Sequence, residues 1–441
     1  MIQLTKTSFL FFIALTLSSC FGPFKELKYQ LEDSLEDSET FVDSPSDLKD
    51  LDNELNIIVE SEFSSGKALK RNFNVTSNDT SLFLLSSSGT VTAVEMNSLN
   101  QLWQYEHNNE IFAGLSSNDN SIFFVDSNGF LISIDHNGKL VWKSFVGEVL
   151  SPPLSLNDFV YIKSTDNKIL SLNTIDGSLK WSYNLPASSL TIRSWGQINY
   201  KKDLLFIGAP AGKVVCLNRI SGSLVWETTY SQPKGPSELE RSNDTTSKPI
   251  FDEDFIYVVA SNGNLATLSL LDGGIVWSRP LSSFYGLSLT KESIFVTHNS
   301  GSIYALSKLD KVLWRNSDLQ GRDVSKPFIF NNFVLVSDFD GYIHILDLVD
   351  GEIIARLKVT DSFIIEPIFA KDTNNLFLVS NDGEIFKISF QKFDDNNKNL
   401  TNNDSYSSVK DDENDSNSLS SNDSGEIVKS ETILDSIIFW N

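Results

Sequence analysis

The feature of this sequence that most constrains its fold is a segment of about forty residues that occurs eight times. The copies begin at Ser81, Ser121, Phe159, Leu204, Phe255, Ser293, Phe333 and Asn375. Successive starts differ by 40, 38, 45, 51, 38, 40 and 42 residues. A period of this length indicates a solenoid or a propeller, because one such unit is too small to bury its own apolar faces and must pack on its neighbours.

Each copy has the pattern of short strands joined by tight turns. A β-branched or aromatic run leads into a polar turn that often contains glycine, as at Gly89, Gly129 and Gly341, and a second alternating run and turn follow. A third run ends the copy, and another short apolar run precedes most copies. Four antiparallel strands per unit predict an all-β propeller made of four-stranded blades.

A tryptophan recurs at one position in the last strand of the repeat. It is present as Trp103, Trp142, Trp181, Trp226, Trp277 and Trp314, and the seventh copy has Ala355 instead. An aromatic residue at the same place in every unit is expected to fill the space between neighbouring blades. An aromatic cage for a ligand is the alternative interpretation.

The two ends of the repeat region predict how the ring closes. The eighth copy stops at Phe390 without a fourth strand, and residues 55–63, ahead of the first copy, read as a strand without a partner. We expect this strand to complete the eighth blade, so that no sheet edge is left open between the chain ends. The prediction is an eight-bladed propeller over residues 55–390; a seven-bladed ring with one degenerate unit is the alternative.

The first twenty residues resemble a bacterial lipoprotein signal. Lys6 precedes a nine-residue apolar run, too short to span a bilayer, and Leu-Ser-Ser-Cys follows at residues 17–20. Residues 1–19 are therefore expected to be removed and Cys20 to carry lipid, with outer-membrane attachment favoured because Phe21 is not aspartate. A plain secretory signal with an incidental cysteine is the alternative.

The net charge of −23 lies mostly in the flanks of the repeat region. Residues 20–54 form an acidic linker, and residues 391–441 form an acidic tail rich in Asn, Asp and Ser that is expected to be disordered. Apolar residues near its end recur at helical spacing, so a short docking helix is the alternative there. No basic cluster suits a phosphate backbone, which excludes nucleic acid as a partner.

The sequence contains no pattern typical of an enzyme. The histidines, His107, His136, His298 and His344, lie in different repeats without a metal-binding spacing. If Cys20 is lipidated, Cys216 has no partner for a disulfide and is expected to be a small buried residue. We therefore predict no enzymatic activity, no cofactor and no metal.

The two longest spacings arise in successive connectors, residues 185–203 and 230–248, each running from the outer strand of one blade to the inner strand of the next. Such connectors emerge on one face of a propeller, so the extra residues should converge. The patch would combine apolar Leu190, Ile192 and Trp195 with charged Arg193, Lys234, Glu238, Arg241 and Asp244. This mixture predicts a protein interface whose loop residues can be replaced without affecting folding; solvated loops are the alternative.

Four features of the sequence together resemble the BamB family of outer-membrane-protein assembly factors. They are the lipoprotein signal, the eightfold repeat with its tryptophans, "SQPKGPSELERSNDTTSKP" at residues 231–249 and "VSDFDGYIHILDLVDGEIIARLKV" at residues 336–359. The resemblance covers residues 55–390. It implies a quinoprotein-like propeller without enzymatic activity, lipid-anchored at the outer membrane and facing the periplasm. Such a protein is a scaffold of the barrel-assembly complex that aids insertion of β-barrel proteins. The two connectors would bind the periplasmic repeats of the central protein, BamA; nascent outer-membrane proteins are a further expected partner, and the ring is expected to be monomeric.

The resemblance also assigns individual contacts. It places Leu190, Ile192 and Arg193 of "SLTIR" at the interface with BamA. Asp244 matches the first of two acids that the family has in the second connector, whereas Thr246 stands at the second. Two other classes stay open on the residues alone: a periplasmic quinoprotein-type dehydrogenase, and a carbohydrate-binding propeller with aromatic residues lining its axial funnel.

Overall fold

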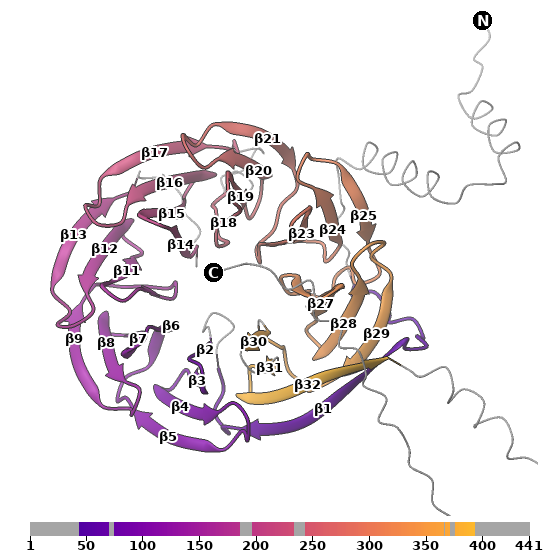
Figure 1. Ribbon diagram of the computed structural model, residues 1–441, viewed down its shortest axis with the longest axis horizontal. Helices are drawn as coiled ribbons and strands as arrows, with labels where there is room; N and C mark the ends of the chain where they lie inside the picture. Colours follow the sequence, from indigo (N-terminus) through magenta and orange to yellow (C-terminus); the bar gives the residue numbers. More distant parts are fainter. Residues whose placement is uncertain are drawn as a thin grey trace, which may run out of the picture. The chain divides into compact units, whose positions relative to one another are not determined.

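The computed structural model describes residues 44–69, 75–185, 196–232, 243–365, 367–370 and 375–392, all within one compact unit, Met1–Phe393. These residues form eight four-stranded antiparallel sheets arranged as the blades of a ring (Figure 1). In each blade the first strand lies nearest the centre and the fourth at the rim. No helix of the described residues is long and apolar enough to cross a membrane.

The first four blades follow one another along the chain. Blade one is β2 (Thr76–Ser77), β3 (Ser81–Leu85), β4 (Thr90–Glu95) and β5 (Gln101–Glu106). Blade two is β6 (Ile111–Ser117), β7 (Ser121–Asp126), β8 (Phe130–Asp135) and β9 (Leu140–Phe145). Blade three is β10 (Leu154–Ser155), β11 (Phe159–Lys163), β12 (Lys168–Asn173) and β13 (Leu179–Asn184). Blade four is β14 (Ile198–Lys201), β15 (Leu204–Ala209), β16 (Lys213–Asn218) and β17 (Leu224–Thr229).

The other blades continue the ring. Blade five is β18 (Ile250–Phe251), β19 (Phe255–Val259), β20 (Asn264–Ser269) and β21 (Ile275–Pro280). Blade six is β22 (Leu287–Leu289), β23 (Ser293–Thr297), β24 (Ile303–Ser307) and β25 (Val312–Asn316). Blade seven is β26 (Phe328–Phe330), β27 (Phe333–Ser337), β28 (Tyr342–Asp347) and β29 (Ile353–Lys358). Blade eight is β30 (Ile368–Ala370), β31 (Asn375–Val379), β32 (Glu384–Lys392) and β1 (Leu55–Ser64).

The burial pattern explains why the middle strands are continuously apolar. Every residue of β3 and of β7 is buried, because both faces of these strands pack on neighbouring blades. The rim strands β5 and β9 instead alternate between exposed and partly buried residues. The buried apolar residues group into eight clusters, and each cluster draws on two adjacent blades. The core of the ring is therefore the set of its blade interfaces.

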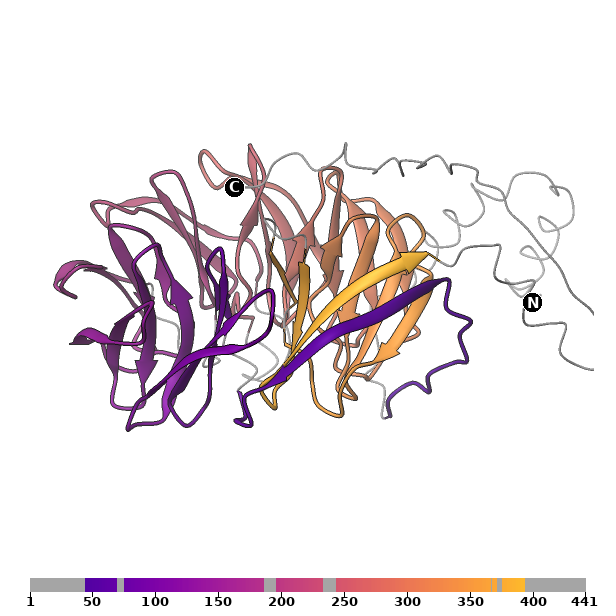
Figure 2. The same ribbon diagram turned by 60° about the horizontal axis from the view of Figure 1, so that its bottom comes forward.

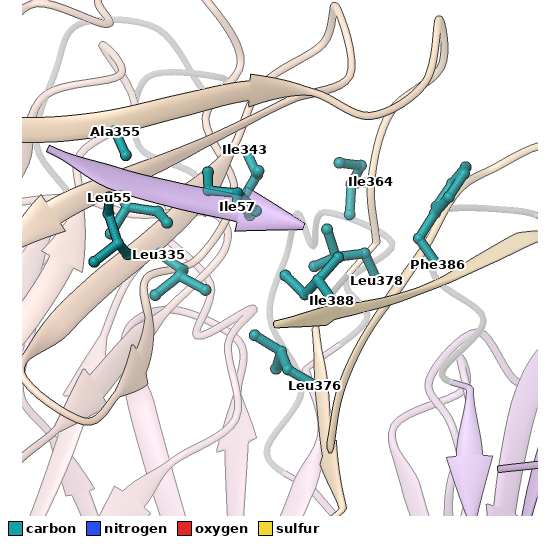
Figure 3. Packing of buried hydrophobic residues seen from close by; sticks show 11 residues of the cluster. Leu55, Ile57, Leu335, Ile343, Ala355, Ile364, Leu376, Leu378, Phe386 and Ile388 are labelled. Carbon is teal, nitrogen blue, oxygen red and sulfur yellow. The ribbon is translucent and has the colours of Figure 1, made fainter. Parts of the chain in front are cut away.

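Strand β1 closes the ring, as predicted from the incomplete eighth repeat. It pairs antiparallel with β32 from Leu55 opposite Lys392 to Ser64 opposite Glu384. Figure 2 shows the two strands side by side although they come from opposite ends of the propeller sequence. Leu55 and Ile57 pack among apolar residues of blades seven and eight, such as Ile343 and Ile388 (Figure 3). The ring has eight blades, so the seven-bladed alternative is wrong.

The repeated tryptophans join each blade to the next. Each indole nitrogen donates a hydrogen bond to a backbone carbonyl in the hairpin between the third and fourth strands of the following blade; Trp314 reaches Leu348 at 3.0 Å and Trp103 reaches His136 at 2.8 Å. A glycine in that hairpin lies against the indole ring in five of the six cases, as Gly351 does for Trp314. The hairpin that Trp277 reaches has Asp310, with a φ of +65°, instead. Blade eight has no such hairpin, because β32 and β1 are not consecutive, which accounts for Ala355 in blade seven.

Residues 44–54, the end of the acidic segment predicted as a linker, pack against blades six and seven. The Ser46 amide donates to the Gln320 carbonyl at 2.9 Å, and the Glu54 amide donates to the Ile354 carbonyl at 2.8 Å. Leu48 packs against the apolar cluster between the two blades. This acidic segment therefore binds blades six and seven through backbone hydrogen bonds and Leu48, which its charge did not predict.

We predict that the glycine under the indole is essential to the blade interface. A Cβ on Gly351, which has a φ of +73°, would lie 2.3 Å from Trp314 Cε3, whereas a Cβ on Gly147, with a φ of +81°, would meet nothing within 4 Å. Both alanine variants suffer the left-handed backbone cost of about 1–2 kcal/mol, and only Gly351→Ala must also displace an indole, at about 1–3 kcal/mol more. Denaturant unfolding followed by tryptophan fluorescence should show the larger loss for Gly351→Ala; equal losses would contradict this role.

Candidate functional site

The described ends of the connectors between blades all lie on one face of the ring. Strands alternate in direction within a blade, so each connector emerges beside the turns that join second to third strands; we name this side the connector face. The hairpins that join third to fourth strands lie on the opposite side, the hairpin face. Connector one links β13 to β14, and connector two links β17 to β18.

Several predicted residues lie outside the described part of the chain. Leu190, Ile192 and Arg193 fall within residues 186–195, and Cys20 and the tail from residue 393 are likewise outside it. The predicted tail began at residue 391, whereas Gln391 and Lys392 pair with β1 and belong to blade eight. The structure describes Leu185, Gly196 and Gln197 of connector one, and it describes residues 230–232 and 243–249 of connector two.

The described ends of the two connectors are in contact. A Cβ on Gly196 would lie 2.6 Å from the Thr245 carbonyl oxygen and 2.9 Å from Lys163 Nζ. A Cβ on Gly208, in β15, would lie 2.7 Å from the same carbonyl. Because only glycine leaves room for this approach, the sequence brings connector two close to both connector one and blade four.

Hydrogen bonds hold the two ends of connector two together. Asn243 Nδ2 donates to the Ser231 carbonyl at 2.8 Å. Thr245 Oγ1 donates to the Lys213 carbonyl at 3.1 Å and lies 2.8 Å from the Tyr230 hydroxyl. Burial raises the pKa of Tyr230, which therefore keeps its proton for this contact. The segment between residues 232 and 243 thus starts and ends on a buried base.

Asp244 belongs to that base and does not lie on the loop surface. Its side chain and backbone are 1% exposed, and Oδ1 accepts the amide of Ala211 at 3.0 Å. Its carbonyl accepts both the amide and the hydroxyl of Ser261, at 2.9 and 3.0 Å. The expectation that Asp244 can be replaced without affecting folding is therefore wrong, because replacing this buried side chain would leave the Ala211 amide without its acceptor.

Lys163, at the end of β11, is a buried cation that sequence reasoning missed. It is 7% exposed, and Nζ donates to the Gly208 carbonyl at 2.7 Å. Burial lowers the pKa of Lys163 to about 8, and the nearby negative charge of Asp244 opposes that lowering. The sequence did offer one indication, because Lys163 lies in the second strand of its blade, where most other residues are apolar. Lys163 ties blade three to blade four directly beneath both connectors.

The described residues contain no group of three His, Cys, Asp or Glu side chains placed to hold a metal ion. The histidines make separate local contacts: His107 with Asp126, and His344 with Asp338. Cys216 is fully buried, and burial raises its thiol pKa to about 12, so it is an inert core residue, as predicted.

An eight-bladed ring of four-stranded antiparallel sheets joined by indole contacts is a β-propeller. A europium-containing methanol dehydrogenase has a similar fold, with a TM-score of 0.62 and 12% identity over 76% of this chain and 93% of that one. The crystal structure of BamB from Moraxella catarrhalis gives a TM-score of 0.69 and 22% identity, covering 76% of this chain and all of that one.

Sequence comparison narrows the class to one family. The model of the outer membrane protein assembly factor BamB family matches residues 87–311. The outer membrane protein assembly factor BamB of Moranella endobia (strain PCIT) is 26% identical over 331 residues, which cover 72% of this chain and 85% of that protein. The chain belongs to the BamB family of outer-membrane-protein assembly factors.

The buried Lys163 predicts a pH dependence of stability. Its pKa in the folded ring, about 8, lies below the value of 10.5 for an unfolded lysine, so burying the charge costs stability at neutral pH. That cost is relieved as the pH rises from 8 towards 10.5, because the folded state loses its proton first. Wild type should gain about 2–3 kcal/mol relative to Lys163→Met between pH 7 and pH 10. Denaturant unfolding of both proteins at both pH values measures this difference in the free energy of unfolding. The contributions of other titrating groups cancel, because both proteins share those groups. A difference that does not change with pH would contradict the lowered pKa of Lys163.

Proposed function

We propose that this protein is a non-enzymatic scaffold of the outer-membrane barrel-assembly machinery and that its connector face binds the periplasmic repeats of BamA. The observation that carries the proposal is the buried base at blade four. There two lengthened connectors of a BamB-family ring meet, held by Lys163, Asp244 and the glycines Gly196 and Gly208. A loop with a fixed base loses little conformational freedom on binding, which favours recognition of a partner.

Within this proposal Arg193 supplies the main polar contact. An arginine forms a bidentate, charge-assisted pair with a carboxylate that a lysine does not reproduce, and Leu190 and Ile192 would exclude water around it. Asp244 enters the interface indirectly, because its buried carboxylate holds the second connector in place. Thr246, where the family has an acid, donates to the Phe284 carbonyl at 3.3 Å and so joins connector two to the next connector.

The two alternative classes have less support. The likeness to a methanol dehydrogenase, at 12% identity, concerns the fold alone. A carbohydrate-binding funnel would present aromatic side chains near the axis. The cavity among β2, β6, β10 and β14, of about 200 Å³, is lined by Val75, Thr76, Leu115, Ser116, Ser117, Pro152, Pro153, Leu154, Ser155, Gln197, Ile198 and Lys248. This lining contains no aromatic residue.

We further propose that lipid on Cys20 anchors the ring to the outer membrane, facing the periplasm. The Cys20→Ser protein should be released into the soluble periplasmic fraction, because a serine lacks the thiol that would carry the lipid and the nine-residue apolar run before it is too short to span a bilayer. Cell fractionation with a high-salt wash measures this, with wild type as the control. Retention of the serine variant in the outer membrane would show that the anchor lies elsewhere.

Reversing the charge of Arg193 should weaken binding to the partner. Arg193→Glu is expected to cost about 2–5 kcal/mol, the range for losing one member of a buried interfacial charge pair. Calorimetric titration of the purified ring with the periplasmic repeats of BamA from the same organism measures the effect. Lys139→Glu, an exposed residue in the hairpin between β8 and β9 on the hairpin face, provides a charge-matched control and should bind as wild type does. Wild-type affinity in the Arg193→Glu protein would exclude connector one from the interface.

A further inference from the structure

A third connector, residues 281–286 between β21 and β22, places two exposed aromatic side chains on the connector face. Phe284 is 50% exposed and Tyr285 is 36% exposed. The repeat spacing of 38 residues at this point is ordinary, so length gave no reason to single the connector out. Exposed aromatic residues are the side chains most often found to dominate protein interfaces.

The backbone around Phe284 is held rigidly. Its amide donates to Asn299 Oδ1 at 2.8 Å, and Asn299 Nδ2 in turn donates to the Ser261 carbonyl at 2.6 Å. The Phe284 carbonyl accepts the Thr246 hydroxyl of connector two at 3.3 Å. The ring of Phe284 is therefore presented at a fixed position next to connector two, with half of its surface open.

Tyr285 and Gly286 contact the connectors on either side of the third connector. The Tyr285 hydroxyl donates to Asp323 Oδ1 at 2.5 Å, in the connector between blades six and seven. Gly286 has a φ of +102°, and a Cβ there would lie 2.9 Å from Ser247 Cβ of connector two. Three successive connectors thus form one joined surface, and its aromatic pair lies beside the base that holds the proposed BamA site.

Other exposed apolar residues of the ring do not share this support. Those at the tips of the hairpin face occur singly, one to a blade: Ile175, Ile220, Leu271, Leu309 and Val349. Scattered single residues of this kind are normal on protein surfaces. Adjacent exposed pairs also occur on rim strands, as Leu140–Val141, Leu224–Val225 and Ile275–Val276, but none of them lies on a connector. The pair of Phe284 and Tyr285 differs because it is aromatic and hydrogen-bonded to connector two.

We propose that Phe284 and Tyr285 form an aromatic anchor for the same folded protein partner that connectors one and two bind. This inference rests on the proposed function. The partner should offer an apolar pocket for the Phe284 ring, placed beside the surface that receives the described end of connector two. The anchor would supply affinity through burial of the ring, whereas Arg193 would supply charge specificity.

The test is calorimetric titration of the full mature chain with the periplasmic repeats of BamA. Phe284→Ala should raise the Kd about 10- to 30-fold, as expected for an aromatic residue at an interface centre. Leu271→Ala, on the hairpin face of blade five and 87% exposed, is the control and should bind as wild type does. The melting temperatures of both variants should match that of wild type, because the contacts of Phe284 that hold the connector are made by its backbone.

The outcomes separate this inference from the function on which it rests. If wild type binds, Arg193→Glu binds weakly and Phe284→Ala binds as wild type does, the aromatic anchor is excluded and the proposed function stands. Equal losses in Phe284→Ala and Leu271→Ala also exclude the anchor, because the effect would not be specific to the connector face. No binding by folded wild type would overturn the proposed function and the anchor together.

Discussion

The pairing of β1 with β32 is the interaction on which the rest of the ring depends. Each blade buries its two faces only against its neighbours, so an open chain of blades would expose an apolar face at each end. Bonding a strand from before the first repeat to the last repeat removes both ends at once. The indole contacts then join each blade to the next one. Blade eight has no hairpin between its third and fourth strands, so blade seven needs no tryptophan to contact one.

A closed ring gives the connectors a rigid base. The buried contacts that hold connectors one and two lie at blade four. Lys163 and Asp244 place opposite charges within the wall of the ring, where both are bonded to backbone groups. Buried charges of this kind cost stability unless their hydrogen bonds are satisfied, so they are expected where a particular arrangement is required. Residues 44–54 also begin at the connector face, where a Cβ on Gly321 would lie 3.0 Å from Pro45 Cα. The chain from the proposed lipid site therefore reaches the ring on the face that we assign to the partner.

The sequence predicted the blades well because the forty-residue period, the turn glycines and the tryptophan all recur from one blade to the next. The same regularity located the closing strand, since the eighth copy visibly lacked one. The site was less predictable. Connector length pointed to the face that we propose for the partner, but the burial of Asp244 depends on the approach of Gly208 in β15 and Ala211 in the turn after it, and Lys163 approaches from a different blade. Phe284 lies in a connector of ordinary length, so its link to Thr246 follows only from the spatial order of blades.

Hydrogen–deuterium exchange of the ring, alone and saturated with the periplasmic repeats of BamA, tests the central claim most directly. The proposed scaffold role predicts slower exchange in the complex for connector residues 186–197, 243–249 and 281–286, with no change at the hairpin turns around Ile175 and Leu271. Protection confined to the hairpin face, or absent from all three connectors at saturation, would contradict the assignment of the connector face as the partner-binding surface.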